Sequence, residues 1–176
     1  MRFIETPLAG AFLIELDLLR DERGYFARTF DAVEFKAAGL DPIVIQCNTS
    51  FNARRGTLRG MHYQADPDGE PKLVRCTRGA IFDVAVDLRP DSATYCRWFG
   101  AELNADNGRM LYIPVGMAHG FQTLEDESDV HYQMAHHYVA GQVRGVRFDD
   151  PAFGIEWPLP NPIVSERDRG FTDFAA

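Results

Sequence analysis

The sequence predicts an all-β protein, a sandwich or barrel of short strands with one or two short helices at its periphery. From Ala11 onward, short apolar stretches alternate with Gly, Pro, Asn and Asp at intervals of about ten residues, which is typical of antiparallel strands joined by turns. The segment 80–88 places Phe82 and Val84 on one face and their neighbours on the other, the period of a strand with one face on a core. Helical patterning is confined to one short segment.

That segment, 32–38, is expected to form a peripheral helix. Asp31 followed by Glu34 resembles a capping box, and Gly39 readily ends a helix because glycine adopts the left-handed conformation without strain. The better strand candidates, in chain order, are 43–51, 57–64, 72–77, 80–88, 97–104, 109–113, 120–124 and 130–138.

The C-terminal segment, from about 151 to 176, is expected to wrap the barrel as an ordered strap. It is rich in proline, which cannot donate a hydrogen bond to a sheet ladder. Its apolar side chains provide the surface that would hold it in place: Phe153, Ile155, Trp157, Ile163 and Val164. The length of 176 residues suits a single domain over 1–176, since single cores usually span roughly 100–200 residues.

Composition and charge exclude several classes of protein. The 18 basic and 26 acidic residues give a net charge of −8, so the global field disfavours nucleic acid and anionic membranes as partners. The apolar runs are far shorter than the roughly 18–20 residues of a membrane span, and the first residues lack the apolar core of a signal peptide.

Cys47, Cys76 and Cys96 have no C-x-x-C spacing and are expected to be buried thiols. We therefore expect a cytoplasmic protein.

Reactive side chains concentrate in three places: in 55–64 with Lys72 shortly after it, in 114–121, and in Tyr132 and Tyr138 together with 165–168. A lone histidine such as His62 is more often a hydrogen-bonded structural residue than a catalyst. Here it is accompanied by a lysine on a strand and by several arginines and tyrosines. That set provides what proton abstraction next to a carbonyl requires: a base near neutral pH, an acid, and cations to hold an enolate.

Two of these segments resemble the motifs of the cupin fold. The segment 114–119 (P-x-G-x-x-H) is similar to the second cupin motif, and 60–64 (G-x-H-x-Q) to a degenerate first motif. A metal-binding cupin offers His-x-His, a carboxylate and the later histidine. Gln64 replaces the second histidine here, so we expect no metal and no other cofactor. The same replacement disfavours a metal-dependent cupin oxygenase.

From about residue 10 to residue 168, the chain resembles the dTDP-4-dehydrorhamnose 3,5-epimerase family. The segments that carry the resemblance are 21–26 (DERGYF), 46–48 (QCN), 56–64 (GTLRGMHYQ), 72–75 (KLVR), 82–89 (FDVAVDLR), 113–121 (IPVGMAHGF) and 149–151 (DDP). The resemblance implies a cupin fold, also called a double-stranded β-helix or jelly-roll barrel. It also implies an isomerase that inverts C3 and C5 of a nucleotide-linked 4-keto-6-deoxy sugar, of the type that converts dTDP-4-dehydro-6-deoxy-D-glucose to dTDP-4-dehydro-L-rhamnose.

The resemblance also implies a role for each site residue. His62 would remove a proton beside the C4 ketone and Asp168 would orient it, while Lys72 would stabilise the enolate. Tyr132 would reprotonate the opposite face, as inversion requires. The residues expected to bind the nucleotide-diphosphate sugar are Arg23, Phe26, Arg28, Gln46, Asn48, Arg59, His119, Tyr138 and Arg167. In the family, the loop that carries Arg23 reaches the neighbouring subunit's site, so a homodimer is implied.

Strand parity adds two expectations about side-chain direction. Arg59 and His62 differ in parity, so both can face one cavity only if a bulge, most simply at Gly60, interrupts the strand. Tyr132 and Tyr138 fall on the same face of a regular strand and could line a single cavity.

Three departures from the family pattern leave the nucleotide open. Arg28 and Val143 stand where the family usually has glutamate, and Arg167 replaces a lysine. A guanidinium only donates hydrogen bonds whereas a carboxylate only accepts them, so Arg28, if it faces the ligand, weakens a preference for dTDP-sugars; alternatively, it turns to solvent. Three other readings remain: an epimerase of another nucleotide sugar, for example a GDP-linked 4-keto-heptose, an enzyme that inverts C3 only, and a non-catalytic sugar-nucleotide-binding cupin.

Overall fold

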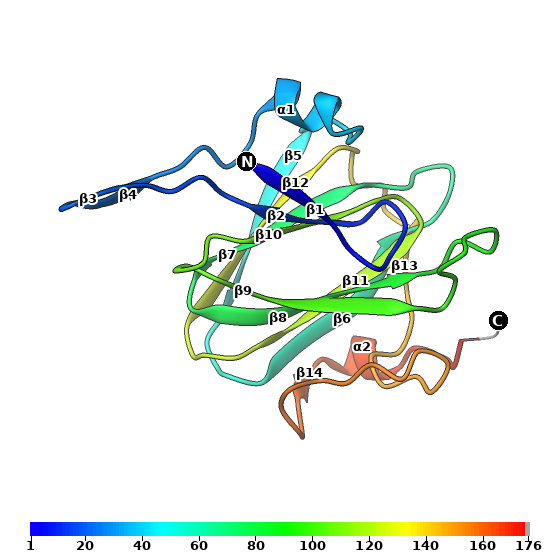
Figure 1. The fold of residues 1–176 in the computed structure, drawn as a ribbon. Helices are drawn as coiled ribbons and strands as arrows, with labels where there is room; N and C mark the ends of the chain where they lie inside the picture. The colour runs from blue at the N-terminus through cyan, green and yellow to red at the C-terminus, as the bar shows by residue number, and fades with distance from the viewer. Residues whose placement is uncertain (175–176) are drawn as a thin grey trace.

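Residues 1–174, which the computed structural model describes, form two six-stranded sheets that face each other (Figure 1). The first sheet has the order β1-β2-β10-β7-β12-β5, and the second has the order β13-β6-β11-β8-β9, with β14 beside β6. Their bounds are β1 (Arg2–Glu5), β2 (Phe12–Glu15), β5 (Gln46–Asn52), β6 (Thr57–Gln64), β7 (Lys72–Arg78), β8 (Ala80–Asp87), β9 (Trp98–Asn104), β10 (Met110–Ile113), β11 (Met117–Thr123), β12 (Ser128–Met134), β13 (Val143–Gly145) and β14 (Ile163–Val164). The expected all-β barrel is confirmed.

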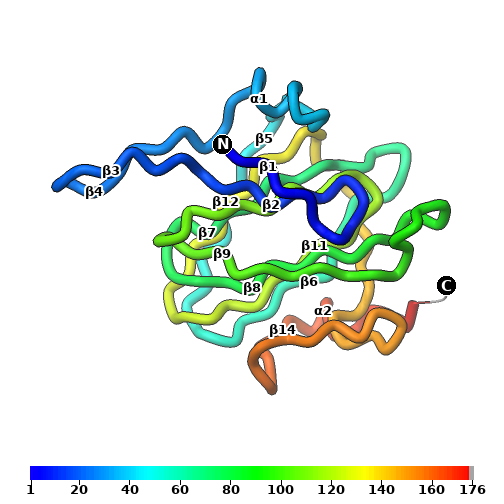
Figure 2. Tube along the Cα trace, viewed as in Figure 1, coloured from blue at the N-terminus to red at the C-terminus, as the bar shows by residue number. Residues whose placement is uncertain are grey.

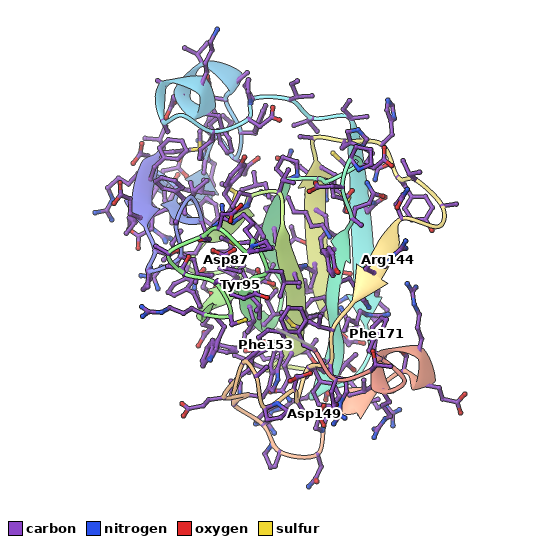
Figure 3. All side chains as sticks on the ribbon, turned by 90° about the vertical axis from the view of Figure 1, so that its right-hand side faces the viewer. Asp87, Tyr95, Arg144, Asp149, Phe153 and Phe171 are labelled. Carbon is purple, nitrogen blue, oxygen red and sulfur yellow. The ribbon has the colours of Figure 1, made fainter. Side chains whose placement is uncertain are left out.

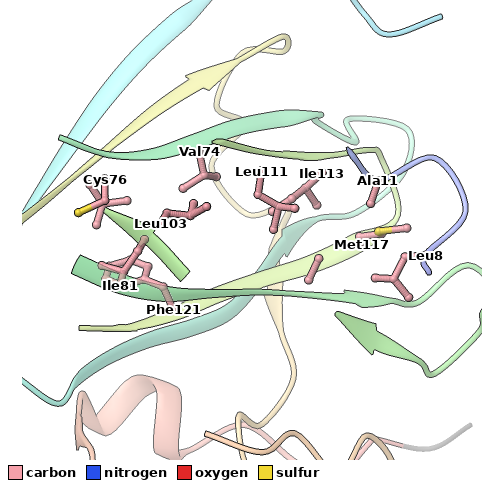
Figure 4. Close-up of a cluster of buried hydrophobic side chains, with 12 residues drawn as sticks. Leu8, Ala11, Val74, Cys76, Ile81, Leu103, Leu111, Ile113, Met117 and Phe121 are labelled. Atoms are coloured by element: carbon pink, nitrogen blue, oxygen red, sulfur yellow. The ribbon is translucent and has the colours of Figure 1, made fainter. Parts of the chain in front are cut away.

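The main core lies between the two sheets. Val74 on β7 and Ile113 on β10 extend from the first sheet, and Ile81 on β8 and Phe121 on β11 extend from the second (Figure 4). All four side chains are buried. This layer fixes the spacing of the sheets, and therefore of any residues that face each other across the barrel.

Strand β8 is buried on both faces, so the expectation of a single buried face is wrong. Ile81 and Ala85 pack in the core between the sheets. Val84 and Val86 pack on the other side, in a cluster that includes Phe153 of the C-terminal segment. The outer face is buried because the C-terminal segment covers it.

Helix α1 (Ala32–Ala37) forms where the sequence predicts it. Asp31 caps it by accepting hydrogen bonds from two backbone N–H groups of the first turn. The expected capping box does not close, because one carboxylate oxygen of Glu34 lies 3.0 Å from the amino group of Met1. Gly39 follows the helix with a φ of 76°. No helix within the described part of the chain is long and apolar enough to cross a membrane.

The hairpin of β3 (Leu19–Asp21) and β4 (Gly24–Phe26) projects away from the barrel (Figures 1 and 2). Every residue of its two strands is exposed. Tyr25 ties it to the barrel, since its hydroxyl donates a hydrogen bond to the carbonyl of Ala105 at 3.2 Å. We call residues 19–26 the arm.

Several strand limits differ from the prediction. Strands β1 to β4 precede the first predicted strand, and each is only three or four residues long, too short to show a clear period. Strand β12 ends at Met134 instead of 138. Gln64 accounts for this end, because its side chain donates to the carbonyl of His137 and accepts from the N–H of Val139. These bonds hold the chain in a loop where a longer strand was expected.

The three cysteines are free thiols, but they are not all buried. Cys76 lies in the core, whereas Cys47 is exposed and Cys96 is half-buried. Cys47 lies on β5 at the edge of the first sheet, where a strand has a neighbour on one side only. Burial of the core thiol raises the pKa of Cys76 to about 11.

From residue 151, the chain forms a strap across the outside of the second sheet (Figures 1 and 3). The buried side chain of Gln122 donates to the carbonyl of Leu159 and accepts from its N–H, both at 2.9 Å. Farther along, β14 pairs in parallel with Thr57 and Leu58 of β6. Helix α2 (Glu166–Arg169) follows directly. The strap thereby brings α2 to the side of β6.

Asp87, at the end of β8, organises the turn that follows the strand. Its carboxylate is fully buried and accepts hydrogen bonds from the side chains of Arg89, Ser92 and Thr94 at 2.6–2.8 Å. Burial alone would raise its pKa, but these donors more than offset that effect and lower the pKa of Asp87 to about 2.

Candidate active site

A cavity of about 630 Å³ lies between the sheets beside the end of the strap. Residues of β5, β6, β7, β11 and β12 and of the segment 163–168 line it. The residues expected at a site that line this cavity are Asn48, Arg59, His62, Lys72, His119, Tyr132, Arg167 and Asp168. The structure therefore brings together side chains from sequence positions as far apart as 48 and 168.

His62 and Asp168 form a close pair at the wall of the cavity. Nε2 of His62 lies 2.7 Å from Oδ1 of Asp168, and the backbone N–H of Gly60 donates to Oδ2 at 3.2 Å. The Asp168 side chain is nearly fully buried in the first turn of α2, where its N–H donates to the hydroxyl of Ser165. Burial raises its pKa, but the hydrogen bonds and the nearby imidazole outweigh burial, so the pKa of Asp168 is lowered overall.

The side chains of Arg59 and His62 both reach the cavity because β6 contains the expected irregularity. His62 pairs with His119 and Arg59 pairs with Phe121, so three steps along β6 match two steps along β11. Gly60 lies within this irregular stretch of β6, where β6 has one more residue than β11, and has a φ of 130°. A Cβ at this position would lie 2.5 Å from the Cα of Gly120, so only glycine fits.

A buried network of charged groups surrounds Lys72. Its Nζ lies 3.2 Å from Oε1 of Glu70, and both side chains are buried. Asp83 is completely buried and its Oδ1 lies 2.7 Å from Nε2 of His119. Burial raises the pKa of Asp83, opposed by the neighbouring His119 and by the positive charge of Lys72. These groups line the cavity or lie directly behind its lining.

Tyr132 faces the same cavity from the other sheet. It lies on β12 of the first sheet, whereas His62 lies on β6 of the second. Its ring centroid is 6.0 Å from that of His119. Burial and the nearby charge of Asp83 raise the pKa of Tyr132, only partly opposed by the positive charge of Arg59. The phenol is therefore protonated at neutral pH.

Five of the expected binding residues lie outside the cavity lining. Gln46 lies next to it, with its amide 3.4 Å from the sulfur of Met134. Arg23 and Phe26 are on the arm. Arg28 forms an ion pair with Asp31 at 2.6 Å, beside the N-terminus of α1. Tyr138 is 63% exposed in the loop after β12, so it does not share the face of Tyr132.

The other two departures from the family pattern, Arg167 and Val143, lie in different places relative to the cavity. Arg167 lies on α2 next to Asp168 and lines the cavity. Val143 begins β13 and pairs with Gln64, and it is not part of the cavity lining.

Several residues of the site were missed by sequence reasoning. Ser50 lines the cavity and shares the strand parity of Asn48, so the same parity argument could have found it. Asp83 is a carboxylate in the middle of β8, flanked by apolar residues, which is itself a signal of function. The lining residues Ile163 and Val164 gave no such signal, because only the path of the strap brings them to the cavity.

The amide of Gln64 is fully used by the protein. Its nitrogen donates to the carbonyls of Asp68 and His137, and its oxygen accepts from Val139. Among residues 1–174, no three His, Cys, Asp or Glu side chains are grouped as a metal site would need. The cavity offers proton donors, proton acceptors and cations.

Comparisons with known proteins identify relatives of this chain in sequence and in fold. A family model described as dTDP-4-dehydrorhamnose 3,5-epimerase matches residues 5–176. The dTDP-4-dehydrorhamnose 3,5-epimerase of Methanothermobacter thermautotrophicus is 47% identical over 174 residues, which cover 97% of this chain and 92% of that protein. Two solved structures have closely similar folds.

The first is the dTDP-4-dehydrorhamnose 3,5-epimerase of Bacillus anthracis with TDP and PPi bound. It has a TM-score of 0.95 and 39% identity, and the match covers 98% of this chain and 99% of that one. The second is a 3'-monoepimerase from Streptomyces bikiniensis in complex with dTDP-quinovose. It has a TM-score of 0.89 and 33% identity, and the match covers 96% of this chain and 85% of that one. The expected barrel topology is confirmed.

Proposed function

Because this chain belongs to the dTDP-4-dehydrorhamnose 3,5-epimerase family, we propose that the cavity between His62 and Tyr132 is its active site. The chain is an isomerase that inverts C3 and C5 of a dTDP-linked 4-keto-6-deoxy sugar. The observation that carries the assignment of the site is the pairing of His62 with buried Asp168, opposite Tyr132 on the other sheet. A base and an acid on opposite walls are what inversion of a planar enolate requires.

His62 acts as the base. Asp168 has a lowered pKa and is ionised at neutral pH, so it accepts a hydrogen bond from the Nε2–H group of His62. Nδ1 then keeps its lone pair and accepts the proton from the carbon next to the C4 ketone. Asp168 holds the ring in this tautomer and stabilises the imidazolium that forms.

Lys72 stabilises the enolate. Removal of the proton places negative charge on the C4 oxygen, and the ammonium of Lys72 lies in the same cavity as His62. Because Lys72 is buried, water screens this attraction less than it would at the surface.

Tyr132 acts as the acid. Its raised pKa keeps the phenol protonated until the enolate carbon takes the proton from the face opposite His62. The phenolate then regains a proton from solvent, and the proton on His62 is lost to solvent. Each inversion therefore exchanges one carbon-bound hydrogen with water.

Positive charge at the cavity suits the diphosphate of the substrate. Arg59 and Arg167 line the cavity, and both can donate to phosphate oxygens in a forked geometry. Asn48 supplies an amide for the nucleoside, and His119 a ring nitrogen for the sugar or phosphate. This assignment follows from donor chemistry and from the family's binding positions.

The exposed arm supports a homodimer in which Arg23 and Phe26 reach the partner's cavity. Phe26 is 70% exposed, and an aromatic ring on a projecting hairpin favours a contact with another chain. The family match from 5 to 176 supports a single epimerase domain, and the free thiols suit a reducing cytoplasm.

The proposal is tested by incubating the protein in deuterium oxide with dTDP-, GDP- and CDP-linked 4-keto-6-deoxy sugars. We expect deuterium at both C3 and C5 of the dTDP-linked sugar, measured by NMR and mass spectrometry. Exchange of the GDP-linked sugar alone would favour an enzyme of another nucleotide sugar. Absence of exchange with every sugar would refute the epimerase proposal and favour a binding protein.

A C3-only epimerase is the second candidate. The observation that favours it is the 33% identity to a structure named a 3'-monoepimerase, which is comparable to the identity to several 3,5-epimerases. The same experiment separates the two candidates, because a C3-only enzyme leaves the hydrogen at C5 in place.

A further inference from the structure

Glu70 is a buried carboxylate whose polar contact in the described chain is with Lys72. Its Oε1 lies 3.2 Å from Nζ of Lys72, and its side chain is 7% exposed. Its Oε2 is buried and finds no hydrogen-bond partner in residues 1–174. Glu70 therefore does not tie down the backbone in the way that Asp87 does at the end of β8.

A buried carboxylate normally has a reason for its position. Moving a carboxylate out of water is unfavourable, and one ion pair offsets this cost only when its geometry is good. Glu70 leaves one oxygen unsatisfied, so the fold gains little from it. Its proximity to a catalytic cation supplies the missing reason.

Lys72 needs such a partner because of its own surroundings. Its side chain is 9% exposed and lines the cavity. Its four-carbon stem has many rotamers, so the position of the ammonium depends on the groups that hold it. Asp83 lies close enough to interact with Lys72 through its charge, but its Oδ1 is already paired with His119. Glu70 supplies the direct ion pair.

We propose that Glu70 is a positioning residue for the epimerisation, holding the ammonium of Lys72 at the cavity wall where the enolate oxygen forms. This inference rests on the function proposed above. Glu70 itself is outside the cavity lining and acts through Lys72. Its location at the turn into β7, two residues before Lys72, places both side chains at the same end of the strand.

The test compares Glu70→Gln with the wild type in the deuterium-exchange assay. Glutamine keeps the size and an acceptor oxygen but removes the charge. We expect kcat to fall by about tenfold or more while KM changes by less than about twofold, because the enolate is charged and the ground-state ketone is not. Glu15→Gln is the control. Glu15 forms an ion pair with Arg109 at 2.8 Å, and neither residue lines the cavity. It should leave kcat unchanged.

A double-mutant cycle with Lys72→Met separates positioning from a structural role. If Glu70 acts through Lys72, adding Glu70→Gln to Lys72→Met should not lower the exchange rate further. The double variant should also melt at a higher temperature than Lys72→Met alone, which leaves a buried carboxylate without its cation.

Three results would overturn the inference: a wild-type kcat in Glu70→Gln, additive rate losses in the double variant, or equal melting temperatures for Lys72→Met and the double variant. Absence of exchange in the wild type would instead refute the proposed function. The melting comparison does not require activity, so the ion pair is tested in either case.

Discussion

Nε2 of His62 and Oδ1 of Asp168 lie 2.7 Å apart, although 106 positions separate the two residues in the chain. His62 is part of β6 within the barrel, whereas Asp168 arrives on the strap outside it. Gln122 holds the strap at Leu159, and β14 then pairs with β6. The base and the residue that orients it are thus built by separate parts of the fold.

We expect His62→Ala to abolish deuterium exchange at both carbons, because one base serves both positions. Asp168→Asn should lower the exchange rate by a smaller factor, because it removes the charge that orients His62 but leaves the imidazole in place. General-base effects on rate are typically roughly 10²–10⁴-fold. Exchange rates at C3 and C5 measured by NMR check both variants. Wild-type exchange in His62→Ala would remove His62 from its assigned role.

Tyr132→Phe should separate proton removal from inversion. The phenyl ring keeps the packing against the core but has no proton to deliver. Deprotonation by His62 should continue, so solvent deuterium should enter C3 with its configuration retained. The stereochemistry of the recovered sugar is the measurement, and inversion at the wild-type rate would point to a different acid.

Mixing two inactive variants tests the arm and the dimer together. If Arg23 serves the partner's cavity, a heterodimer of Arg23→Ala and His62→Ala contains one complete site, with His62 from one protomer and Arg23 from the other. Activity should then rise above that of either variant alone after co-expression. If Arg23 serves its own cavity, or if the chain is monomeric, mixing should restore nothing. Analytical ultracentrifugation of the wild type supplies the control.

Arg28→Glu should leave the choice of nucleotide unchanged. In the structure Arg28 pairs with Asp31 and is mostly exposed, which agrees with the alternative that its side chain turns to solvent. We expect the ratio of kcat/KM for dTDP- and GDP-linked substrates to change by less than about twofold. A shift of about tenfold toward the dTDP-linked substrate would show that Arg28 contacts a ligand, through the partner's site if not its own.

Acid should weaken the fold through Asp87. Because the pKa of Asp87 is lowered to about 2 when folded, its ionised form stabilises the native state above its unfolded pKa of about 3.9. This contribution, about 2–3 kcal/mol, should be lost as the pH falls from about 4 to below 2. Urea unfolding of Asp87→Asn across this range is the measurement. If the free energy of unfolding of Asp87→Asn changed with pH as it does in the wild type, this role of Asp87 would be contradicted.

The sequence predicts the barrel and α1 because these depend on local patterns, whereas most of the cavity residues were expected from the resemblance to the epimerase family. Alternation indicated β8, and the parity conflict between Arg59 and His62 correctly indicated the irregularity at Gly60. These features follow from the period of a strand, which is visible in a single segment.

Other features depend on contacts between distant segments and could not be predicted. The burial of the outer face of β8 requires the strap, and the early end of β12 requires the side chain of Gln64. Alternation could not predict which way the side chain of Arg28 points, because the chain there is irregular. Its ion pair with Asp31 holds it at the surface. Residue type alone also could not show that the carboxylate of Glu70 lies beside Lys72, with its second oxygen unpaired among residues 1–174.

The strap also sets the order in which the site is assembled during synthesis. Every strand of both sheets except β14 precedes residue 151, so the barrel leaves the ribosome before Asp168 does. The strands that carry His62, Lys72 and Tyr132 are therefore synthesised before Asp168, the carboxylate that pairs with His62. Of the residues assigned to the chemistry, Asp168 is therefore the last to be synthesised, and it reaches His62 only through the strap that Gln122 holds at Leu159.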